Sequence, residues 1–167
     1  MKNTSFVEYL SPPREQGKKM LRLEDNLWNY IPEPTDRIIT ISGHLLKQSV
    51  MGSDLSYEDV TENRRLYQIY DAEIIGNEIY NNQECYVLEL KAKETDITYY
   101  SRKIWVDKER WLPLKEERYA KSGKLLKKTE IEEVFKVSGR WYPKKMNFKD
   151  MLLKGNGTEY IIDSINT

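Results

Sequence analysis

The sequence predicts a mainly β protein built as an antiparallel meander. Three observations favour this fold class. Apolar and polar residues alternate with a period of two over most of the chain, turn-forming residues recur every ~10–15 positions from Tyr70 onward, and helical spacing is confined to one region. The chain has 167 residues, the length of one domain, and shows no repeat of the solenoid or propeller kind.

The N-terminal part is expected to hold four short strands and then a helical interruption. The expected strands cover residues 5–10, 19–23, 27–31 and 37–42. Gly43–Asp54 changes to near-helical spacing, which favours a short helix or turn ended by Gly52. Ser56 and Asp59 fit a capping box, so a short helix is expected over residues 57–65.

From Tyr70 to the end, strand patterns alternate with turn residues. The expected strands cover residues 70–75, 84–92, 102–107, 112–120, 125–137, 142–153 and 158–165. The first of these is expected to break at Gly76-Asn77, and Asn156-Gly157 is the strongest hairpin signal in the chain. Because each strand follows its neighbour after a short turn, the pattern predicts a meander.

Composition excludes several classes of function. Lys+Arg and Asp+Glu both number 27, so no global basic field attracts phosphates and no nucleic-acid partner is expected. One Cys and one His leave no disulfide framework and no Cys/His zinc site. His44 has no partner in the sequence pattern and is interpreted as a surface or structural residue, whereas Cys85 lies within a strand and is expected in the core.

Enzyme signatures are absent from the sequence. Glu116/Glu117 and Glu132/Glu133 are adjacent on strands and point to opposite faces, so neither pair can converge as acid and base, and solvated faces are expected for them. No phosphate loop, dinucleotide motif or hydrolase motif occurs. The prediction is a protein that is not an enzyme, with no catalytic residue, no metal and no cofactor.

Neither a membrane span nor a signal peptide can be recognised in the chain. No segment reaches the ~18 apolar residues that a spanning helix needs, and residues 1–10 lack the apolar region of a secretory leader.

The apolar residues must gather on one face of the expected sheet. A curved sheet covered by one short helical segment would enclose a concave apolar cavity, which is the usual form of a small-ligand site. The alternative is an ordinary packed core, and composition does not separate the two.

Several segments together resemble the outer-membrane lipoprotein-sorting proteins, the LolA-like superfamily. The resemblance begins with Phe6–Pro13, Gly17–Leu21 and Asp25–Pro32, and is strongest over Arg37–Ile39 and Ser49–Asp59, which includes the string MGSDLSYED. It continues in Ile104–Asp107, Leu112–Lys115 and Gly139–Pro143.

The resemblance implies an open, incomplete β-barrel around an apolar cavity, with a short helical lid. It implies a non-catalytic, extracytoplasmic (periplasmic) carrier or receptor for lipoprotein acyl chains or other lipids, with a membrane exporter or an outer-membrane acceptor as partner. Residues 1–167 would form one such domain, lacking the family's usual N-terminal portion. The first strand would then be an exposed edge that pairs with a second copy or another strand. The alternative function is a protein-interaction or sensing module on the same half-barrel.

The resemblance also indicates where the ligand would lie. By position, residues 51–59 would form the lid, with Met51, Leu55 and Tyr57 as cavity contacts and Trp28 and Tyr30 on the facing sheet. The remaining expected cavity residues, large and apolar, are Leu46, Val50, Met146 and Phe148. The same string also fits a structural role, with Gly52 in a turn and Ser53 or Asp54 as a cap.

Overall fold

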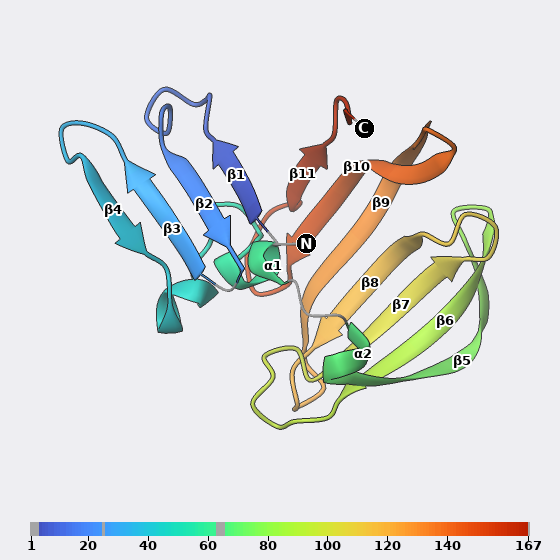
Figure 1. Cartoon of the computed structure of the whole chain (residues 1–167). Helices are drawn as coiled ribbons and strands as arrows, with labels where there is room; N and C mark the ends of the chain where they lie inside the picture. Colours follow the sequence, from blue (N-terminus) through green and yellow to red (C-terminus); the bar gives the residue numbers. More distant parts are fainter. Residues whose placement is uncertain (1–3, 25, 63–65, 167) are drawn as a thin grey trace. The chain divides into compact units, whose positions relative to one another are not determined.

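The computed structural model describes residues 4–24, 26–62 and 66–166. The chain divides into two compact units, Met1–Asn63 and Arg64–Thr167. Both units are built from antiparallel sheets, as the alternating sequence pattern predicts (Figure 1). That the whole chain acts as a single domain stays a prediction.

The first unit is a four-stranded sheet with helical cover. Its strands β1 (Thr4–Glu8), β2 (Lys19–Leu23), β3 (Asn26–Ile31) and β4 (Arg37–Thr40) pair in chain order. The 3-10 helix η1 (Gly43–Lys47) and helix α1 (Tyr57–Thr61) follow. The buried residues of this unit's core are Met20, Leu27, Ile41, Val50 and Tyr57. Because two of these come from the strands and two from the segment after η1, the core joins the sheet to its cover.

The second unit is a seven-stranded meander. Helix α2 (Leu66–Ile69) leads into β5 (Tyr70–Tyr80), β6 (Gln83–Ala92), β7 (Ser101–Asp107), β8 (Pro113–Tyr119), β9 (Leu125–Val137), β10 (Arg140–Asp150) and β11 (Thr158–Ile161). The order in the sheet is the chain order, from β5 at one edge to β11 at the other (Figure 1). The two edge strands do not pair with each other, so the sheet is not closed into a barrel.

The second sheet has packed residues on both faces of β6. Cys85 and Val87 point to one face, where they pack with Trp105 and Leu114. Leu90 points to the other face and packs with Tyr70 and Ile104. Cys85 is fully buried, which confirms its expected place in the core.

Some predicted boundaries are wrong. The break predicted at Gly76-Asn77 does not occur, because β5 continues to Tyr80 and takes up the glycine in a register shift between Ile74 and Gly76. The predicted helix over residues 57–65 ends at Thr61, whose hydroxyl donates to the Tyr57 carbonyl at 2.7 Å; residues 63–65 lie outside the described part of the chain.

Other ends shift for similar local reasons. The strand predicted over residues 142–153 runs from Arg140 to Asp150, because the Asp150 side chain accepts from the Leu152 amide at 2.9 Å and turns the chain. The strand predicted to reach residue 165 ends at Ile161. The helical part of Gly43–Asp54 is limited to η1, and helix α2 was not predicted.

Candidate functional site

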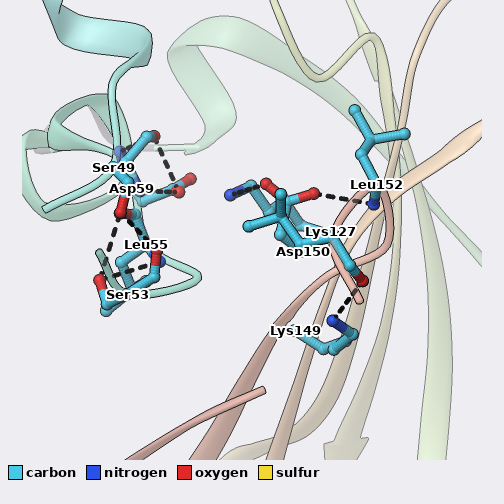
Figure 2. Close-up of polar contacts among 10 residues, drawn as sticks. Ser49, Ser53, Leu55, Asp59, Lys127, Lys149, Asp150 and Leu152 are labelled. Carbon is cyan, nitrogen blue, oxygen red and sulfur yellow. Dashed lines mark hydrogen bonds and ion pairs between the residues drawn. The ribbon is translucent and has the colours of Figure 1, made fainter. Parts of the chain in front are cut away.

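The cover of the first unit is a hairpin-like segment locked by its own backbone. Ser49 and Ser56 form an isolated antiparallel bridge, and the Val50 amide donates to the Leu55 carbonyl at 2.8 Å. Ser49 Oγ donates to the Ser53 carbonyl at 2.6 Å, within the group of contacts drawn in Figure 2. Met51 stands at the tip with a positive φ of 54°. The segment thus holds Met51 in a fixed place without any long helix.

The predicted capping box at the start of α1 is present. Ser56 Oγ accepts from the Asp59 amide at 3.2 Å, and the Ser56 amide donates to Asp59 Oδ2 at 2.8 Å. The cap orients Tyr57, whose hydroxyl accepts from Asn29 Nδ2 at 2.6 Å on β3. Through this bond, α1 is tied to the sheet beneath it.

A hollow of about 220 Å³ lies between this cover and the sheet. Its apolar lining includes Ile39, Ile41, Leu45, Met51 and Tyr57. Lys18, Lys19, Asn29 and Gln48 also line it. Typical small-molecule pockets measure about 300–1,000 Å³, so this hollow is below the size of a complete ligand site.

A larger hollow, of about 440 Å³, lies on the second unit's sheet. All of its lining residues are apolar or aromatic: Ile74, Tyr86, Leu88, Val106 and Trp111. Strand register brings them together, because Tyr86 is opposite Val106 and Leu88 is opposite Ile74. The hollow falls within the size range of small-ligand sites.

Trp111 forms the most exposed wall of this hollow. It lies in the turn between β7 and β8 with φ of 57°, and its side chain is 70% exposed. Its ring stacks on Tyr86, with centroids 6.2 Å apart and planes at 30°. Lys108 Nζ lies 4.9 Å from the centroid of the Tyr86 ring. An apolar ligand in the hollow would therefore meet an aromatic pair with a cation at its border.

A row of charged side chains crosses the same face beyond the apolar residues. Glu116 accepts from Arg102 at 2.9 Å and from Arg118 at 3.0 Å. The Arg102 guanidinium carbon lies 4.8 Å from the centroid of the Tyr70 ring and 5.6 Å from that of the Tyr99 ring. Burial by itself raises the pKa of Glu116, but the two guanidinium groups outweigh it and leave the pKa below its usual value.

On the opposite face of the second sheet, ion pairs surround the buried cluster of Cys85, Val87, Trp105 and Leu114. Lys115 pairs with Glu117 at 2.7 Å, and Lys128 pairs with Glu130 at 2.9 Å. Tyr80 donates to Glu130 at 2.7 Å. Burial and its hydrogen bond with Glu117 raise the pKa of Tyr119 to about 12. The 440 Å³ hollow lies on the face that carries Tyr86, Leu88 and Val106.

The carboxylate pairs diverge as predicted, though with less exposure than expected. Glu116 contacts Arg102 and Glu117 contacts Lys115, on opposite faces of β8. The expected solvated face holds for Glu132 and Glu133, both exposed, but not for Glu116 and Glu117, since ion pairing half-buries both. Neither pair joins two carboxylates.

The predicted cavity residues are distributed over both units. In the first unit, Tyr30, Met51 and Tyr57 line the smaller hollow. Val50 is buried in the adjoining core, and Leu46 packs against it. Leu55 contributes its backbone carbonyl, which accepts from the Val50 amide. Trp28 follows the buried Leu27 on β3 and is half-buried.

Met146 and Phe148 lie on β10 of the second unit, both half-buried. Phe148 meets Tyr160 edge to face at 6.3 Å, and Met146 is paired with Ile131 in the sheet. Neither lines the 440 Å³ hollow. Their role in ligand binding stays a prediction.

The five residues around the larger hollow were missed from the sequence. The sequence of this strand alternates Cys85 and Val87 with Tyr86 and Leu88, so it indicates that Tyr86 and Leu88 share a face. What was lacking was a sign that Trp111, in a turn, would fold back over that face. Trp111 has a positive φ, a backbone conformation that the sequence predicts only where the residue is Gly or Asn.

Comparisons with known proteins agree with this fold. A family model described as "Uncharacterized protein" matches residues 1–167, so the chain belongs to that family. No curated protein matches the chain. A DUF1329 family protein from Desulfovibrio piger is similar with a TM-score of 0.81 and 29% identity, covering 89% of this chain and 65% of that one.

Two further solved structures carry lipoprotein-sorting names. A LolA superfamily protein from Nitrosomonas europaea has a TM-score of 0.68 and 25% identity over 97% of this chain and 74% of its own. A putative outer membrane lipoprotein-sorting protein domain from Vibrio parahaemolyticus has a TM-score of 0.78 and 24% identity over 90% of this chain and 66% of its own. The predicted LolA-like resemblance is confirmed, and the fold is of the lipoprotein-sorting or carrier type.

The chain spans about two thirds of the length of the first two structures, 65% and 66%. Among the described residues, no helix is both long enough and apolar enough to cross a membrane.

Proposed function

We propose that this protein is a non-catalytic, extracytoplasmic carrier or receptor for the acyl chains of lipoproteins or other lipids. The observation that carries the proposal is the hollow of about 440 Å³ whose five lining residues are all apolar or aromatic. A hydrocarbon chain needs a wall of this kind, because it offers no hydrogen bonds and gains free energy from removing apolar surface from water.

The energetics suit carriage. Burying ~14 methylenes at ~0.8 kcal/mol each gives about 11 kcal/mol of gross transfer free energy. A bilayer offers the chain the same apolar surroundings, so the net preference for the protein is small. Passing the ligand to an acceptor then requires a small difference in affinity and no chemical step.

The environments of Cys85, a potential nucleophile, and His44, a potential base, support a non-catalytic role. Burial raises the pKa of the Cys85 thiol, and nearby Asp107 raises it further, which disfavours the reactive thiolate. His44 lies exposed in η1. The likeness to lipoprotein-sorting folds supports a periplasmic setting, with a membrane exporter as donor or an outer-membrane protein as acceptor.

In this proposal residues 1–167 work as one domain, and the lid is the segment that covers the first unit's own hollow. Met51, Leu55 and Tyr57 belong to the locked cover, and Tyr30 lines the sheet below it. Trp28, Leu46, Val50, Met146 and Phe148 remain proposed contacts for other parts of the ligand.

Mass spectrometry of an organic extract tests the proposal. The protein is purified from bacteria without detergent and extracted into chloroform and methanol. We expect an acyl-containing lipid at about one equivalent per chain. A clean extract, together with no binding of a fluorescent fatty acid, would contradict carriage.

A specific observation favours a second candidate, a protein-interaction module. Strand β1 is an edge of its sheet, and all five of its residues are exposed, Phe6 by 60%. An exposed edge offers backbone groups to an added strand, from a partner or a second copy. Light scattering distinguishes this case: a stable dimer that a Phe6→Pro change dissolves would support it. The Tyr9 amide donates to the Lys18 carbonyl on β2, so by alternation the Phe6 amide points to the free edge, where proline removes the donor.

A further inference from the structure

The loop between β10 and β11 exposes three large apolar residues in succession. Met151 is 42% exposed, Leu152 57% and Leu153 51%. Single exposed apolar residues are common on protein surfaces, but a contiguous group is a sign of an interaction site. The loop lies at the end of the second unit's sheet, where β9 begins and β10 ends.

This loop is held in place by its own contacts (Figure 2). The Met151 amide donates to the Leu126 carbonyl at 2.8 Å, and the Leu152 amide donates to Asp150 Oδ1 at 2.9 Å. Lys149 Nζ donates to the Leu153 carbonyl at 2.7 Å. Since the backbone is already ordered, the three side chains are presented outward with little entropy left to lose on binding.

The charges around the loop have one predominant sign. The neighbouring segments 120–127 and 149–157 contain Lys121, Lys124, Lys127, Lys149 and Lys154. Their single carboxylate, Asp150, forms an ion pair with Lys127 at 2.8 Å. Lys121, Lys124 and Lys154 are exposed. The surface therefore combines an apolar tip with a cationic surround.

We propose that this loop docks the protein on an anionic lipid bilayer. Leucine and methionine side chains enter the boundary between headgroups and acyl chains, while the long lysine side chains reach the anionic headgroups. The charge complementarity favours an anionic membrane over an uncharged one. This inference goes beyond acyl carriage, because it concerns the membrane surface that the protein binds and not the ligand in its hollow.

Vesicle flotation tests the docking. The whole chain is mixed with vesicles of phosphatidylcholine alone, or of equal parts phosphatidylcholine and phosphatidylglycerol. We expect binding to the mixed vesicles that weakens as salt rises. The double change Leu152→Asp with Leu153→Asp is expected to weaken vesicle binding about 30-fold, because two leucine side chains that enter the bilayer part-way are lost. Lys121→Glu with Lys124→Glu should weaken it by at least tenfold.

Ile79→Asp is the matched control, since Ile79 is 77% exposed on the same unit but lies in β5. It should bind vesicles like the unchanged protein, and thermal melting should show all variants folded. No vesicle binding, equal binding to both vesicle types, or equal binding by the double leucine variant would each overturn the proposal. Fatty-acid binding measured in parallel separates this failure from a failure of carriage, because the loop variants should keep it.

Discussion

Replacing Trp111 by alanine removes one wall of the larger hollow with little damage to the fold. The Trp111 side chain is 70% exposed and its ring stacks on Tyr86. Such a stack contributes about 0.5–1.5 kcal/mol, so the free energy of unfolding should fall by about 1 kcal/mol. A ligand loses more: if the ring covers two methylenes, the loss is about 1.6 kcal/mol, or an affinity about 15-fold weaker.

Displacement of a fluorescent fatty acid measures this change. Trp141→Ala is the matched control, because Trp141 is also a tryptophan of the second unit with an exposed ring, 38%, but does not line the hollow. The reasoning is refuted if Trp111→Ala binds as tightly as the unchanged protein, or if Trp141→Ala weakens binding equally.

Three more predictions concern the lid, the charged row and a turn. Met51→Asp should weaken binding of a fluorescent fatty acid, because it places a carboxylate on the lining of the smaller hollow, and the chain should still fold, because Met51 is only half-buried; unchanged binding would remove Met51 from the proposed lid. Glu116→Gln should cost about 3 kcal/mol at neutral pH by denaturant unfolding, since it removes the carboxylate that pairs with buried Arg102 and half-buried Arg118. Because the folded-state pKa of Glu116 is lowered, that difference should be full above about pH 4.5 and vanish as pH falls through the lowered value; a difference independent of pH would contradict it. Gly157→Ala should lower stability by about 2 kcal/mol, as its Cβ would stand 2.6 Å from the Phe148 carbonyl oxygen at φ of 99°; an unchanged melt would contradict it.

The fold was predictable because alternation and turn residues act locally. The capping box at Ser56 follows from contacts within three residues. The tight hairpin predicted at Asn156-Gly157 is wrong, because Phe148 pairs with Thr158 and the two residues lie in the longer loop 151–157. Gly76 misled the prediction, because a bulge lets β5 continue past the glycine while its pairing with β6 resumes on the other side. Helix α2, with four residues, is too short to produce a periodic signal.

The site was predictable only in part. The lid segment at Met51 and Tyr57 came from the family resemblance, and both residues line a hollow. The larger hollow depends on register across β5, β6 and β7, which pairs Tyr86 with Val106 although they are far apart in sequence. It also depends on the turn conformation of Trp111, which no local pattern specifies.

Photocrosslinking with a diazirine-bearing fatty acid tests the central claim most directly. After irradiation and proteolysis, we expect label in the peptides that contain Tyr86, Val106 or Trp111, and we expect an unlabelled fatty acid to compete for this labelling. Label confined to other peptides, or label that an excess of fatty acid does not displace, would contradict it.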